Sequence, residues 1–137
     1  MLDTTLKAQL QGYLERLVDP VELVVATDDG EPSRQLRALA DDIAALSSKI
    51  TVRDDSDATR VPSFAIARAG EPARVRFAGL PLGHEFSSLV LALLQVSGHP
   101  PRVEPAVAEQ IRALPAGLDF DVVVSLSCHN CPDVVQA

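Results

Sequence analysis

The sequence has no tryptophan, one tyrosine and only two cysteines, and its basic side chains are outnumbered by acidic ones. Its 12 lysines and arginines against 19 aspartates and glutamates give a net charge of −7. That balance argues against nucleic acid and anionic membranes as partners, because both need clustered positive charge. The longest apolar run, Leu89–Leu94, is far shorter than the roughly 20 residues that span a bilayer. The first residues lack the basic and apolar regions of a secretion signal, so a cytoplasmic location is expected.

Two cysteines are too few for an ordinary structural zinc site, which needs two cysteine pairs or one pair with two histidines. His84 and His99 are isolated and do not form an H-x(3–5)-H pair. His84 is interpreted as a capping or surface residue. A structural disulfide is the other alternative, but it suits an oxidising compartment, and closing so short a loop stabilises little. Both alternatives rank below a redox dithiol, and no metal site is expected.

Cys128 and Cys131 form a C-x-x-C motif that Pro132 follows directly. The preceding residues, Phe120–Leu126, predict a valine-rich strand, and Pro132–Ala137 predict the first turns of a helix. A dithiol on such a strand-to-helix turn is typical of thioredoxin-like redox proteins. The N–H groups at a helix start favour the thiolate of the first cysteine, and the second can then close the disulfide. We therefore expect Cys128 to be the attacking thiol and Cys131 the resolving, more buried one.

Residues 1–98 predict a thioredoxin-like α/β unit that contains no cysteine. Leucines at helical spacing predict two amphipathic helices, and an almost wholly apolar stretch predicts a buried third helix near its end. The order of elements is α-β-α-β-β-β-α, which predicts one four-stranded mixed sheet with helices packed on it. The strands are expected near Val21–Ala26, Ile50–Arg53, Val61–Ile66 and Arg74–Phe77.

A shift of 100 residues places Val21–Thr27 over Asp121–Ser127, which indicates an internal repeat. Asp28 and Glu31 then fall where the cysteines are, and we interpret them as exposed turn residues. Residues 99–117 are expected to form a linker with a short leading helix. Residues 118–137 are expected to begin a second thioredoxin-like unit, with its strand joined to or packed on the first sheet. That unit is truncated, so the chain is expected to be a fragment of a longer protein.

Several blocks of the sequence resemble the flavoprotein component of bacterial alkyl hydroperoxide reductases. The resemblance implies tandem thioredoxin-like folds, of which only the second carries the dithiol. It also implies that electrons pass from NADH through FAD and a flavin-domain dithiol to Cys128 and Cys131, and then to a peroxidase subunit. No FAD or NADH contact is expected in this chain, because it has no G-x-G-x-x-G motif. The blocks are Pro62–Phe64, Phe77–Gly79, Pro81–Phe86, Ser88–Leu94 and Ser125–Ala137.

The resemblance implies a protein-disulfide reductase that supports peroxide reduction. Its partners would be the peroxidase subunit, which is a peroxiredoxin, and the flavin domain of its own chain. The full-length protein would be a homodimer. The alternative is a non-catalytic thioredoxin-like docking module with an inactive, severed dithiol.

Three further residues have candidate roles. The resemblance implies that Glu85 exchanges a proton with Cys131, although a carboxylate stabilised by the helix dipole is the simpler alternative. His129 is expected to place positive charge beside Cys128, or else to be a solvated turn residue. Pro62 is the candidate for the cis-proline that precedes the third strand of thioredoxin-like folds, and a structural role is favoured for it.

Overall fold

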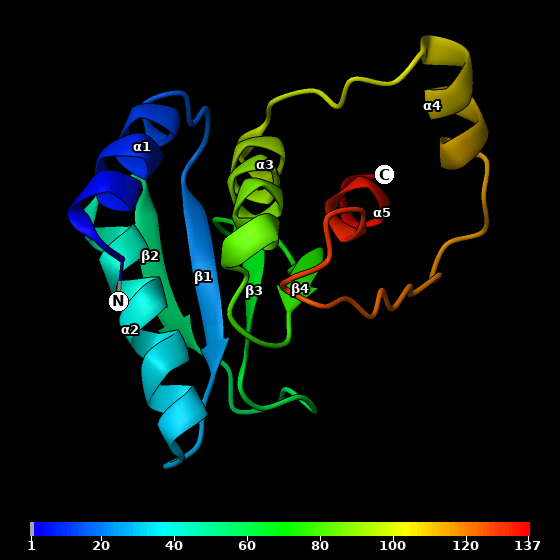
Figure 1. Cartoon of the computed structure of the whole chain (residues 1–137). Helices are drawn as coiled ribbons and strands as arrows, with labels where there is room; N and C mark the ends of the chain where they lie inside the picture. The colour runs from blue at the N-terminus through cyan, green and yellow to red at the C-terminus, as the bar shows by residue number, and fades with distance from the viewer. Residues whose placement is uncertain (1) are drawn as a thin grey trace.

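The computed structural model describes residues 2–137, and its centre is one four-stranded sheet with the strand order β2-β1-β3-β4 (Figure 1). Strands β1 and β2 are parallel, whereas β1–β3 and β3–β4 are antiparallel. A single mixed sheet in residues 1–98 was expected from the sequence, and this prediction is confirmed. The strands are β1 (Val21–Ala26), β2 (Ile50–Asp54), β3 (Ser63–Arg68) and β4 (Val75–Phe77).

The first two helices begin where the sequence provides capping groups. Helix α1 (Thr4–Leu14) starts after Asp3, whose carboxylate accepts a hydrogen bond from the N–H of Leu6 at 2.8 Å. It ends earlier than the leucine stripe, although Leu17 is still buried in the core. Helix α2 (Glu31–Ala45) has a proline in its first turn, where a missing N–H costs nothing.

The third helix positions the site described below. A short 3₁₀ turn, η1 (Gly83–Glu85), leads directly into α3 (Phe86–Ser97). Leu89 and Leu93 of α3 are fully buried, as the apolar stretch predicted. Gly98 ends the helix with φ +125°, a backbone conformation that suits glycine.

The main core lies between one face of the sheet and helices α1, α2 and α3, which cover it in Figure 1. Alternate residues of β1 point into this core, because successive side chains of a strand face opposite sides. The core fills with aliphatic side chains around a single fully buried phenylalanine. Its fully buried members include Leu10, Val21, Leu23, Leu36, Leu39, Ile43, Phe64, Ile66, Leu89 and Leu93.

The last third of the chain leaves this body and returns to it (Figure 1). Helix α4 (Pro105–Arg112) has no buried residue. Residues 113–130 form no helix or strand, and α5 (Cys131–Gln136) then packs against η1 and α3. None of the helices in residues 2–137 is long and apolar enough to cross a membrane.

The expected strand at Phe120–Leu126 is not formed, and that prediction is wrong. Phe120 is 81% exposed and Val123 is 95% exposed, so the segment neither joins the sheet nor packs along it. Valine-rich residues become a strand only when a neighbouring strand satisfies their backbone and covers their side chains. The nearest edge, β4, has three residues, which is too short to supply that neighbour. The sequence repeat is therefore not a structural repeat here, since only its first copy is a strand.

Candidate redox site

Cys128 and Cys131 are joined by a disulfide whose Cα atoms lie 5.5 Å apart, which confirms that the two residues can bridge. Cys128 lies on the turn before α5 and Cys131 is the first residue of that helix. The backbone N–H of Cys131 donates a hydrogen bond to Sγ of Cys128 at 3.2 Å. Such a donor favours negative charge on the sulfur of Cys128 when the disulfide is reduced. Both cysteines are half-buried, so their exposure does not rank them, and the order of attack stays a prediction.

The dithiol turn is docked on the start of α3. The backbone N–H of His84 donates to the carbonyl oxygen of Leu126 at 3.4 Å. At the other end, the side-chain amide of Gln136 donates to the hydroxyl oxygens of Ser87 and Ser88 at 3.0 and 3.1 Å. The first thioredoxin-like unit thus supplies a wall beside the dithiol.

Glycine is required at position 83 for this docking. Gly83 has φ +60°, which L-residues with a side chain rarely adopt. A Cβ atom at this position would lie 3.1 Å from the carbonyl oxygen of Leu126. The missing side chain therefore lets η1 and the dithiol turn approach each other closely.

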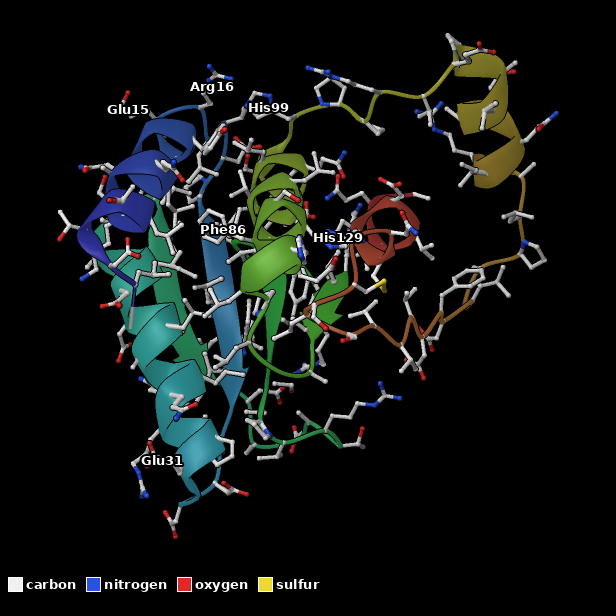
Figure 2. The ribbon with its side chains drawn as sticks, in the orientation of Figure 1. Glu15, Arg16, Glu31, Phe86, His99 and His129 are labelled. Carbon is white, nitrogen blue, oxygen red and sulfur yellow. A yellow bond between two sulfur atoms is a disulfide. The ribbon has the colours of Figure 1, made fainter. Side chains whose placement is uncertain are left out.

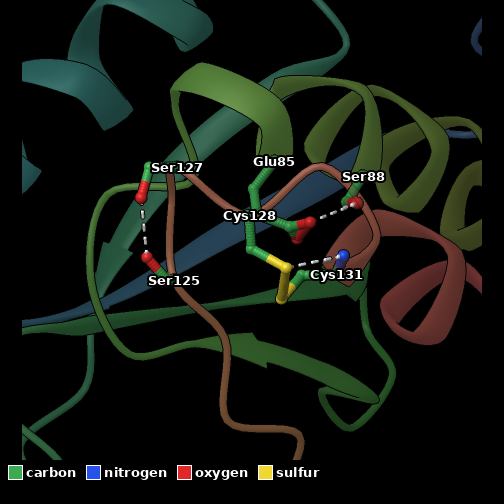
Figure 3. Close-up of a disulfide and its surroundings, with 6 residues drawn as sticks. All are labelled: Glu85, Ser88, Ser125, Ser127, Cys128 and Cys131. Carbon is green, nitrogen blue, oxygen red and sulfur yellow. Dashed lines mark hydrogen bonds between the residues drawn. A yellow bond between two sulfur atoms is a disulfide. The ribbon is translucent and has the colours of Figure 1, made fainter.

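Glu85 is the buried carboxylate of the site. It is 2% exposed, and its side chain extends toward the disulfide in Figure 3. The hydroxyl of Ser88 lies 3.5 Å from Oε1, whereas Oε2 has no hydrogen-bond partner among residues 2–137. A buried carboxylate with a free oxygen is suited to accept a proton from a neighbouring thiol. The arrangement is compatible with the acid–base role predicted for Glu85, which remains a prediction.

His129 has a partner that the sequence reasoning missed. Its ring lies against the ring of His84, with the centroids 4.3 Å apart and the planes at 60°. His84 is exposed, as expected of a surface residue, but it is not isolated in space. The only sequence signal for this pair was that His84 lies in one of the blocks, Pro81–Phe86, that carry the family resemblance.

Pro62 lies apart from this group, directly before β3. The Val61–Pro62 peptide bond is cis, which is the form expected for this position. The residues that hold the dithiol turn come instead from the segment 83–88. A structural role for Pro62 therefore stays the prediction.

At the position where the sequence repeat aligns the first unit with the cysteines, Asp28 organises the turn before α2. Its carboxylate accepts hydrogen bonds from the hydroxyl of Ser33 at 2.7 Å and from the N–H of Gly30 at 2.9 Å. The Ser33 bond is the main reason why the pKa of Asp28 lies below its usual value. Asp28 and Glu31 are exposed turn residues, as predicted.

The described residues offer little room for a cofactor. No group of three or more histidine, cysteine, aspartate or glutamate side chains in residues 2–137 is arranged to hold a metal ion. The two best-formed hollows have volumes of about 230 and 110 Å³, below the roughly 300–1,000 Å³ of typical ligand pockets. The chemistry that this arrangement supports best is therefore thiol–disulfide exchange at Cys128 and Cys131.

No family model matches the chain, but individual proteins do. It is 55% identical over 137 residues to the alkyl hydroperoxide reductase flavoprotein AhpF of Pseudomonas putida, and 47% identical over 137 residues to a Bacillus subtilis protein named NADH dehydrogenase. A solved structure of AhpF from Enterococcus faecalis is 30% identical with a TM-score of 0.83, and the match covers 98% of this chain and 71% of that one. The chain belongs to the AhpF family of alkyl hydroperoxide reductases.

The match locates the chain within this family. The NTD_N/C domain of AhpF from Enterococcus faecalis is 29% identical with a TM-score of 0.83, and 99% of this chain and 72% of that one are covered. The thioredoxin-like α/β fold class is therefore confirmed. The whole chain is matched by the Pseudomonas putida and Bacillus subtilis relatives, but it spans only 26% and 27% of their lengths.

Proposed function

We propose that the chain relays electrons, as the dithiol-bearing N-terminal part of an alkyl hydroperoxide reductase flavoprotein. The observation that carries the proposal is the Cys128–Cys131 disulfide, docked against the segment that contains the buried Glu85. The names of the Pseudomonas putida and Bacillus subtilis relatives support NADH as the electron source. FAD and NADH would bind to a flavin part of the longer protein and not to these residues.

The exchange begins with the reduced dithiol. The thiolate of Cys128 attacks one sulfur of the partner's disulfide, a mixed disulfide forms, and the partner's other sulfur leaves as a thiolate. Cys131 then loses its proton to Glu85 and attacks Sγ of Cys128. The Cys128–Cys131 disulfide forms again, the mixed disulfide breaks, and Glu85 returns the proton to the leaving sulfur. Two electrons pass to the partner, which becomes a dithiol.

The proposal includes the setting of this exchange. The electron acceptor would be the disulfide of a peroxidase subunit, a peroxiredoxin, and the donor would be the flavin domain of a longer chain. The longer protein would act as a homodimer in the cytoplasm. Residues 1–98 would form the first unit, residues 99–117 a linker with α4, and residues 118–137 the beginning of a second unit.

The test is electron transfer from the pre-reduced 137-residue chain to the oxidised peroxidase subunit of a relative. We expect transfer that is slower than from a longer chain with a complete second fold, because that fold would add docking surface and a cis-proline wall. Equal rates from both chains would show that residues beyond 137 are dispensable. The absence of transfer from both, with reduced thioredoxin as a positive control, would overturn the proposed function.

A further inference from the structure

His84 contacts the dithiol turn on both sides of Cys128. Its backbone N–H donates to the carbonyl oxygen of Leu126, two residues before the cysteine. Its imidazole ring meets the ring of His129, one residue after the cysteine. Cys128 is therefore held between two neighbours that the same residue of η1 contacts.

The geometry of the ring pair is specific. The ring planes meet at 60° with centroids 4.3 Å apart, which is an edge-to-face contact. In such a pair, the positive edge of one ring lies against the negative face of the other, so the contact fixes the ring orientation as well as its distance. His129 lies where α5 faces α3 (Figure 2), so its ring is held on the side of the first unit.

From this geometry, and given the proposed function, we infer that His84 is a positioning residue for the dithiol: its ring holds the imidazole of His129 beside Cys128. Positive charge beside a cysteine sulfur favours the thiolate, which is the form that attacks disulfides. A freely rotating His129 would spend less time near the sulfur. His84 would thereby increase the reactivity of a cysteine that it does not itself bond.

Other charged groups near the turn act on the same sulfur. Glu85 of η1 lies in the surroundings of the disulfide, and its negative charge opposes the thiolate (Figure 3). Asp133 lies in the first turn of α5 and also opposes it. Replacing His84 leaves both carboxylates and the charge of His129 unchanged, so its effect isolates the orientation of the His129 ring.

The experiment uses the full 137-residue chain, reduced with dithiothreitol and freed of it. The fraction of Cys128 thiolate is measured against pH, from the rate of alkylation by iodoacetamide in a background where Cys131 is serine. We expect His84→Ala and His84→Leu to lower the thiolate fraction near neutral pH by roughly two- to tenfold, the range that corresponds to the loss of one aromatic pair. His84→Phe keeps a ring and should stay within about twofold of the parent chain.

Two further comparisons separate positioning from a general loss of stability. His129→Ala should lower the thiolate fraction, and adding His84→Ala to it should cause no further change, because the two residues act as a unit. His99→Ala is the matched control, because His99 lies at the far end of α3 beside Arg16 (Figure 2). It should leave the profile unchanged.

The inference fails if both His84→Ala and His84→Leu, still folded by circular dichroism, have the parent's pH profile. It also fails if the effects of His84→Ala and His129→Ala add independently. No peroxidase subunit takes part in this measurement. A failure of the proposed electron relay would therefore appear in the transfer assay and leave the alkylation result to be judged alone.

Discussion

Gly83 and Leu126 approach so closely that a Cβ on Gly83 would lie 3.1 Å from the carbonyl oxygen of Leu126. Gly83→Ala should therefore displace the dithiol turn, and it also places alanine at φ +60°. We expect the free energy of unfolding to fall by about 1–3 kcal/mol, as for other residues held in rare backbone conformations. Urea unfolding measures the loss, and the rate of disulfide reduction by dithiothreitol should rise.

A second glycine provides the control for this substitution. Gly12 lies within α1, and a Cβ there would meet nothing within 4 Å. Gly12→Ala should raise the free energy of unfolding by about 0.5–1 kcal/mol, because alanine favours a helix interior. If Gly83→Ala were as stable as the parent chain, the close contact between η1 and the dithiol turn would not exist in solution.

Glu85→Gln tests the buried carboxylate. It removes the group that would accept the proton of Cys131, so the resolution of a mixed disulfide should slow by about 10²-fold or more, as for other lost acid–base groups. The free energy of unfolding should stay equal or rise, because the substitution removes a buried charge with one weak partner. Stopped-flow release of a small thiol from a mixed disulfide measures the rate. An unchanged rate would assign Glu85 a structural role only.

Much of the fold could be predicted from the sequence, because its first 98 residues satisfy one another. Leucines at helical spacing and short β-branched runs predicted the order of elements. The strand expected at Phe120–Leu126 could not be judged in the same way, because the segment has strand propensity but lacks a neighbouring strand. The C-x-x-C motif identified the dithiol, whereas the His84–His129 contact depends on how α5 docks on η1, which spacing does not reveal.

The core of the first unit should respond strongly to truncation. Leu89 of α3 is fully buried among the core leucines. Leu89→Ala should lower the free energy of unfolding by about 2–5 kcal/mol, because it loses apolar burial and leaves a cavity. Val123→Ala is the control: Val123 is 95% exposed, so the change should stay within about 0.5 kcal/mol. Equal losses from both substitutions, measured by urea unfolding, would contradict the described packing.

Acid should destabilise the chain through carboxylates that are hydrogen-bonded when it is folded. The pKa of Asp42 is lowered chiefly by the N–H of Leu2, and that of Asp28 chiefly by the hydroxyl of Ser33. In the unfolded chain each would titrate near its ordinary value of 3.8. The unfolded state therefore binds more protons below that pH, and the stabilisation present above it is lost as the pH falls through the lowered values.

The substitution that checks this pH dependence is Asp42→Asn. Its free energy of unfolding should lie below that of the parent chain at neutral pH and approach it in acid. Urea unfolding measured from neutral pH to below the ordinary carboxylate range follows the difference. A difference that stays constant with pH would show that Asp42 contributes no proton-linked stability.

The most direct test of the electron relay is to trap its mixed disulfide. The Cys131→Ser chain, reduced and mixed with the oxidised peroxidase subunit, should form a covalent one-to-one adduct through Cys128, because the resolving thiol is missing. The Cys128→Ser chain should form none, and dithiothreitol should release the adduct. Mass spectrometry of the intact adduct identifies the bridged cysteine. An adduct with Cys128→Ser and none with Cys131→Ser would reverse the roles of the two thiols, and no adduct with either would contradict the relay itself.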